Sequence, residues 1–148
     1  MTWLKRDRVY TQPPPKSTGR EHYNTKFINQ MFRAAMGLPA KDILRTVTEF
    51  SAYSIWYNYN RYIKPKVKVN ELFVSGGGAK NPILMRALTH YFKGVIIEKV
   101  KHSGMDIDNK EAILFSVLAN ECLAGNSANM PSVTGAKKNV ILGKICLA

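Results

Sequence analysis

An apolar run, three glycines and an Asn-Pro pair follow one another within residues 71–92, ELFVSGGGAKNPILMRALTHYF. Residues 72–74 form a short continuous apolar run, which is typical of a strand buried on both faces. Asn81 is a favourable N-cap and Pro82 a favourable first helical residue, so a helix is expected over 82–91. A strand that turns directly into a helix favours an α/β fold, in which helices flank a parallel sheet.

Hydrophobic spacing predicts the other elements. We expect helices over 24–36, 40–63 and 108–123 and a second strand within 94–100. The tail reads as a loop followed by a short apolar strand or helix, and periodicity does not decide between them. Two strands are too few, because a sheet of about five or six is usual. Either the tail and the N-terminal segment supply edge strands, or other strands come from a part of the protein absent from this chain.

The bulk composition indicates a globular protein. The chain has 148 residues, 45% hydrophobic and 22% charged, which suits one domain or part of a larger one. Three consecutive prolines predict an irregular segment over 1–23 and a folded part over 24–148. No apolar stretch reaches the ~20 residues that cross a bilayer and no signal peptide is visible, so a cytoplasmic location is expected. Cys122 and Cys146 are read as small core residues rather than as a disulfide or zinc site.

The net charge of +12 is the unusual bulk property. Basic domains attract phosphate nonspecifically, so a nucleic-acid-binding module is the alternative interpretation. The lysines and arginines are scattered over nearly every segment, and no helix-turn-helix, zinc or RNP pattern is present, which argues against it. A scattered excess is more typical of a solvated surface or of the basic half of a larger protein.

The glycines Gly76, Gly77 and Gly78 have two interpretations. Ligands of open parallel sheets bind at the carboxyl ends of strands, where glycine lets a ligand approach the backbone and the next helix offers unpaired N–H groups. Alternatively, a sharp turn between a strand and a helix simply requires glycine. The segment is neither GxGxxG nor GxxxxGK[ST], so it carries neither a Rossmann fingerprint nor a P-loop.

Three further patterns each have a structural and a functional interpretation. Asp108 and Glu111 form a capping box, or the helix start carries a ligand-binding carboxylate. The segment KSTGRE, residues 16–21, is a solvated loop or an anion contact. The histidines lie far apart in the sequence with no obvious acidic partner, which argues against a catalytic or metal-binding histidine. Aromatic side chains cover nearly all sides of the helix over 40–63, which indicates core plus an association surface, as in a homodimer.

Four motifs in this order resemble the C-terminal part of anhydro-N-acetylmuramic acid kinases, sugar kinases of the actin-like ATPase superfamily. They are PPPKSTGRE, FVSGGGAKNPILM, GMDIDNKEAILFSVLA, and PSVTGA followed by VILGKI. Each motif alone is weak, but together they span nearly the whole chain. The resemblance implies a partial ribonuclease-H-like C-terminal lobe, with residues 1–23 near the interlobe region.

The resemblance also implies an activity and its site. Such kinases use ATP and Mg²⁺ to open the 1,6-anhydro ring with water and to phosphorylate O6, a step of peptidoglycan recycling. By this resemblance, Gly76, Gly77, Gly78 and Asn81 belong to the nucleotide side, and Glu111 faces the sugar. The family's N-terminal lobe, its phosphate-binding loop and its catalytic aspartate have no counterpart here. We therefore assign no catalytic and no metal-binding residue, and expect a portion of the kinase that is inactive without the missing N-terminal lobe.

Overall fold

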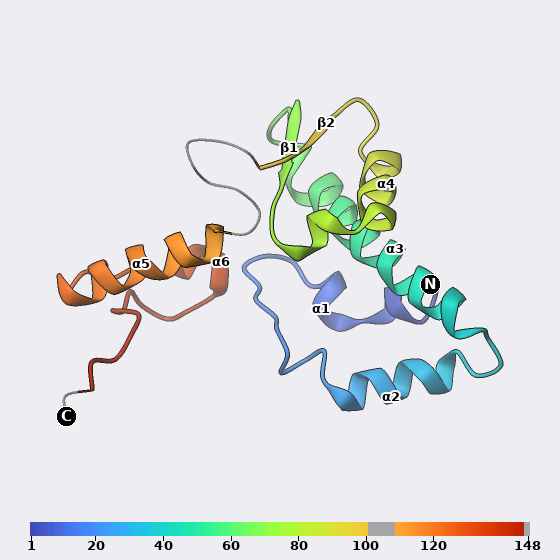
Figure 1. Cartoon of the computed structure of the whole chain (residues 1–148), viewed down its shortest axis with the longest axis horizontal. Coiled ribbons are helices and arrows are strands. Elements are labelled where there is room, and N and C mark those ends of the chain that lie inside the picture. The colour runs from blue at the N-terminus through green and yellow to red at the C-terminus, as the bar shows by residue number, and fades with distance from the viewer. Residues whose placement is uncertain (101–108, 147–148) are drawn as a thin grey trace.

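The computed structural model describes residues 1–100 and 109–146 and shows a small parallel sheet with helices packed against one of its faces (Figure 1). The N-terminal half contains short helices η1 (Leu4–Arg6) and α1 (Arg8–Thr11) and longer helices α2 (Thr25–Ala34) and α3 (Ala40–Asn58), which continues as the π-helix η2 (Tyr59–Ile63). The remainder contains β1 (Glu71–Val74), η3 (Gly77–Lys80), α4 (Pro82–Tyr91), β2 (Ile96–Lys99), α5 (Lys110–Leu123) and α6 (Pro131–Thr134).

The predicted strand–helix–strand unit is confirmed. The strands β1 and β2 pair in parallel, with Glu71 opposite Ile96 and Val74 opposite Lys99, and α4 forms the crossover between them. The predicted helices over 24–36 and 40–63 are also present, and Gly37 follows the first of them with a positive φ of 86°. The sequence pattern thus predicted the local elements of this part correctly.

The main core lies where α3 and α4 meet the sheet. Its buried residues are Ala52, Ala87, Leu88 and Phe92, and Leu88 is only 1% exposed. The two alanines present little side-chain volume where α3 faces α4, so the helix backbones approach closely. This contact holds α4 in a fixed position. Because α4 is the helix that follows the glycines, its first turn is fixed as well.

A second core forms at the N-terminus, where an irregular segment was expected. Leu4 and Tyr10, from the two short helices, are buried against Phe50 of α3. Asp7 caps α1 by accepting hydrogen bonds from the backbone N–H groups of Val9 and Tyr10 at 2.8 and 3.3 Å. The three consecutive prolines predicted an irregular segment, and the capped turn before them was not predicted. Much of the aromatic surface of α3 is consequently core, because Tyr53 and Tyr57 pack on Tyr10.

The prediction that both strands are buried on both faces is wrong for this chain. Phe73 is 57% exposed and Ile96 is 56% exposed, so one face of the sheet lacks a cover. The accessible surface of 11194 Å² also exceeds the roughly 7,600 Å² expected for a compact monomer of 16.7 kDa. The chain therefore leaves apolar surface uncovered that a complete domain would bury.

The apolar part of the tail, residues 139–146, forms neither the strand nor the helix expected there from the sequence. Among the described residues, neither the tail nor the N-terminal segment forms a strand, and the tail contributes only the short helix α6. Helix α5 has no buried residue, and Figure 1 shows it beside α6, apart from the body that contains α3 and α4. Cys146 is exposed, Cys122 is half-buried, and neither belongs to a buried core, so the expectation of two core cysteines is wrong. Within the described ranges, no helix is long and apolar enough to cross a membrane.

Replacement of Leu88 should show how much the main core contributes. Leu88→Ala removes a fully buried side chain between α4 and the sheet, so we expect the free energy of unfolding to fall by about 2–5 kcal/mol. Leu44→Ala is the matched control, because Leu44 is 69% exposed on α3 and its loss should change stability by less than about 0.5 kcal/mol. Urea titrations followed by circular dichroism measure both, and equal losses would contradict this description of the core.

The buried Tyr10 phenol should make the chain sensitive to alkaline pH. Burial raises the pKa of Tyr10 well above its ordinary value of 10.0, and interaction with the Tyr53 hydroxyl adds to the effect. The unfolded chain therefore loses this proton first as the pH rises, and stability that is fully present below pH 10.0 declines above it. In Tyr10→Phe the decline should be shallower. Urea titrations at a series of alkaline pH values would detect it, and an identical decline in both proteins would contradict the assignment.

Candidate functional site

The three glycines after β1 occupy different environments. Gly76 has φ 78° and ψ −178°, a backbone conformation that is essentially restricted to glycine. Gly78 has an ordinary φ, but a Cβ added to it would lie 3.1 Å from Cδ2 of Leu84, so packing favours glycine there. The turn therefore explains Gly76, and contact with α4 explains Gly78.

Gly77 is explained by neither reason. Its φ lies outside the left-handed region, and a Cβ added to it would meet no atom of the chain within 4 Å. The position is the first residue of η3, just after the carboxyl end of β1, where ligands of parallel sheets bind. Open space beside a backbone that needs no glycine for its own conformation is what close approach of a ligand requires. Gly77 is the strongest candidate for a binding residue in the loop.

Asn81 is the N-cap of α4, as the sequence predicted. Its Oδ1 accepts hydrogen bonds from the backbone N–H groups of Ile83 at 2.9 Å and Leu84 at 3.2 Å, and Pro82 is the first helical residue. This capping uses the carbonyl end of the side chain. A nucleotide contact by Asn81 stays a prediction, and its amide NH₂ is the group that would make it.

Glu111 lies in the first turn of α5 and is exposed. Its partner in the predicted capping box, Asp108, lies outside the described residues, so the capping box is untested. Asn109 occupies the N-cap position without a side-chain cap. In the described ranges, no hydrogen bond or ion pair joins Glu111 to the glycine loop. In the sequence, the glycine loop follows β1 and Glu111 follows β2, and these two strands pair in parallel.

Lys16 has a structural role that the sequence did not suggest. Its ammonium group donates to the backbone carbonyls of Val9 and Tyr10, each at 3.2 Å, and of Gln12 at 2.8 Å. It thereby satisfies carbonyl groups at the end of α1. Burial lowers the pKa of Lys16. The lysine of the KSTGRE segment is therefore neither a freely solvated side chain nor one directed only at an anion.

The prediction that the histidines have no acidic partner is wrong for His22. Its Nε2 lies 2.7 Å from Oδ2 of Asp7, whose side chain is only 6% exposed. The same carboxylate caps α1 through its other oxygen, so the pair ties the segment around residue 22 to the N-terminal turn. Fifteen residues separate the two, and no local motif announces the contact. In the part of the chain that the structure describes, no group of three or more potential ligands could hold a metal ion.

Substitution by alanine should distinguish the two glycines that begin the loop. Gly76→Ala places a Cβ on a backbone restricted to glycine, so the free energy of unfolding should fall by about 1–3 kcal/mol. Gly77→Ala meets no such strain and no neighbour, so stability should stay the same or rise by up to about 1 kcal/mol. Thermal unfolding compares them directly. A large loss in Gly77→Ala would show that the chain itself requires this glycine.

Comparison with known proteins identifies the family of this chain. The sequence model of the family described as "Anhydro-N-acetylmuramic acid kinase" matches residues 1–148. A protein named anhydro-N-acetylmuramic acid kinase from Caldanaerobacter subterraneus subsp. tengcongensis is 35% identical over 146 residues, covering 97% of this chain and 37% of that protein. Its namesake from Clostridioides difficile is 39% identical over 142 residues, covering 96% of this chain and 37% of the relative.

A third relative of the same name, from Bacillus cereus strain AH187, is 39% identical over 136 residues, which cover 89% of this chain and 35% of the relative. The chain thus spans somewhat more than a third of the length of the curated relatives it matches. The match extends over the glycine loop, α4 and the first turn of α5. The chain belongs to the anhydro-N-acetylmuramic acid kinase family.

Proposed function

We propose that this chain is the C-terminal portion of an ATP-dependent anhydro-N-acetylmuramic acid kinase. The complete enzyme would open the 1,6-anhydro ring with water and phosphorylate O6, a cytoplasmic step of peptidoglycan recycling. The proposal is supported by the match of the whole chain to the family and by the names of its relatives. The corresponding fold is one lobe of the actin-like ATPase type, to which the parallel β1–α4–β2 unit would contribute.

The open space at Gly77 is the observation that carries the nucleotide part of the proposal. A nucleotide beside the glycine loop would meet backbone at Gly77 without a side chain between them, while Gly76 holds the turn. Asn81 stands at the beginning of α4, where the helix dipole favours negatively charged or polar groups. ATP would supply the phosphoryl group. Among the residues that the structure describes, no carboxylate cluster fits Mg²⁺.

Glu111 is the proposed sugar contact. An exposed carboxylate in the first turn of α5 can accept hydrogen bonds from sugar hydroxyl groups. Its position after the second parallel strand would place it at the same edge of the sheet as the glycine loop. It would bind and orient the anhydro ring. No residue here takes the role of the catalytic base by motif.

The proposed partner is the missing N-terminal lobe of the same enzyme. The chain covers only 37% of its relatives' length, and it exposes Phe73 and Ile96 on the uncovered face of the sheet. Helix α5 adds a further row of exposed apolar side chains, among them Phe115 and Leu123. Burial of such surfaces contributes roughly 25 cal/mol per Å², so a complementary part of the enzyme would stabilise this one. Without it, the chain should not turn over ATP.

Calorimetric titration of the chain with magnesium ATP tests the nucleotide site. We expect binding, and Gly77→Ala should weaken it about tenfold, because a methyl group would intrude where the nucleotide meets the backbone. Leu44→Ala, distant in sequence and exposed, serves as a control. Unchanged affinity in Gly77→Ala would contradict the assigned role of this glycine. Sugar-dependent ATP turnover by the chain alone would contradict the view that it is incomplete.

A titration with duplex DNA at two salt concentrations tests the alternative function suggested by the net charge of +12, a nucleic-acid-binding module. Nucleic-acid binding through phosphate contacts weakens steeply as salt rises. ATP binding without DNA binding supports the kinase proposal. DNA binding that weakens with salt, in the absence of ATP binding, would favour the basic-module interpretation.

A further inference from the structure

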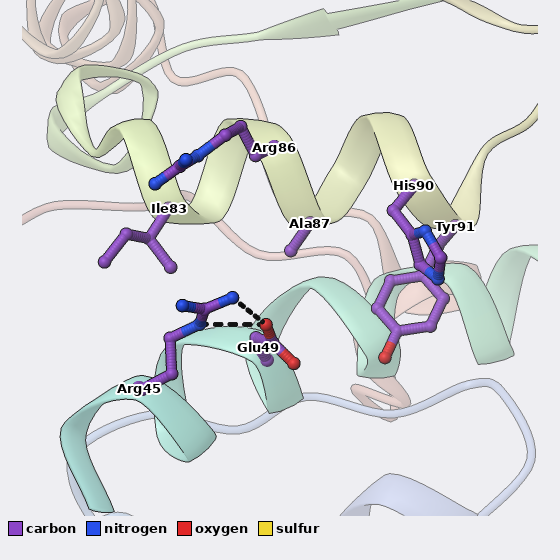
Figure 2. Close-up of a pocket in the computed structure, with 7 residues that line it drawn as sticks. All are labelled: Arg45, Glu49, Ile83, Arg86, Ala87, His90 and Tyr91. Atoms are coloured by element: carbon purple, nitrogen blue, oxygen red, sulfur yellow. Dashed lines mark hydrogen bonds and ion pairs between the residues drawn. The ribbon is translucent and has the colours of Figure 1, made fainter. Parts of the chain in front are cut away.

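A groove between α3 and α4 has the size and lining of a small-ligand site (Figure 2). Its volume is ≈ 310 Å³, near the lower end of the range of about 300–1,000 Å³ for ligand pockets. It is lined by Arg45, Glu49, Ile83, Arg86, Ala87, His90 and Tyr91. None of these residues belongs to the nucleotide or sugar contacts described above.

Regular helical spacing builds the groove. Arg45 and Glu49 lie one turn apart on α3, and Arg86 and His90 lie one turn apart on α4. Buried Ala87 lies between them and belongs to the main core, where α3 and α4 are in close contact. The groove is therefore carried by two helices held in a fixed relative position rather than by loops, which favours a preformed site.

The charges of the groove favour an anion. Nε and Nη2 of Arg45 contact Oε1 of Glu49 at 2.9 and 2.8 Å, which orients this guanidinium and leaves Nη1 for another acceptor. Arg86 has no carboxylate partner in the described part of the chain. Glu49 is the one acidic residue of the lining, against two arginines.

Figure 2 shows that the arginine side chains and the ring side chains lie at different ends of the groove. Both arginine side chains extend toward the end beside Ile83, whereas the rings of His90 and Tyr91 stand at the other end. An anionic group at the first end would meet guanidinium N–H donors, which match phosphate oxygens in geometry as well as in charge. The rings at the second end offer flat surfaces to a carbon skeleton.

We propose that this groove binds a small phosphate monoester. Arg86 is its main anion ligand, and Arg45, held by Glu49, is the second. The size of the cavity admits a compact metabolite. Asn81 caps the start of α4, directly after the glycine loop, so a ligand in the groove would contact the same helix that follows this loop. The inference does not depend on the proposed kinase activity.

Calorimetric titration of the full chain with glucose 6-phosphate, inorganic phosphate and unphosphorylated glucose tests the proposal. We expect the ester to bind at least as tightly as phosphate, and glucose not to bind. Arg86→Gln should weaken binding of the ester about tenfold or more, since it removes a charge-assisted hydrogen bond. Lys41→Gln is the matched control: it removes the same charge from an exposed position of α3 outside the groove, and should leave binding unchanged.

Two outcomes would overturn the assignment. Equal weakening in Arg86→Gln and Lys41→Gln would show that the net positive charge, rather than the groove, attracts the ester. Binding that survives Arg86→Gln but is lost in Gly77→Ala would place the phosphate at the glycine loop. That second result would leave the nucleotide proposal intact, so the two proposals fail separately. Circular dichroism of each variant confirms that it is folded.

Discussion

The close contact between α3 and α4 is the interaction on which the rest of the structure depends. Ala52 and Ala87 let the two helices approach, and Leu88 and Phe92 fill the space between α4 and the sheet. Because α4 follows the glycine loop directly, this packing also fixes where the loop ends. The same pair of helices carries the arginine-lined groove. One packing contact thus positions both candidate sites.

The chain has buried cores, but one face of its sheet leaves apolar side chains exposed. The second core, around Leu4, Tyr10 and Phe50, anchors the N-terminal segment to α3. The sheet exposes Phe73 and Ile96, although phenylalanine and isoleucine are ordinarily buried. A sheet of two short strands is marginal by itself, because three or more strands or a helical cover are needed for independent stability. The exposed apolar face is therefore consistent with a lobe that other strands complete.

The glycine loop shows why sequence alone left its role open. The three residues are identical, yet glycine is required at Gly76 by a backbone angle and only favoured at Gly78 by its neighbour Leu84. Gly77 has neither requirement, and this difference is visible only in three dimensions. A run of glycines indicates a tight turn, whereas the space around each one determines which is left for a ligand. Of the three glycines in the motif, Gly77 is therefore the candidate for a ligand contact.

The sequence by itself determined the local elements of residues 24–100 and the family, because helical periodicity, the Asn81 cap and the four motifs are encoded by neighbouring residues. Tertiary structure decided what depends on contacts distant in sequence. The Asp7–His22 pair and the groove between Arg45 and Arg86 each join side chains that no local pattern relates. The expectation of fully buried strands failed for the same physical reason: an apolar run favours burial, but burial also requires a covering element, and this chain does not supply one for Phe73.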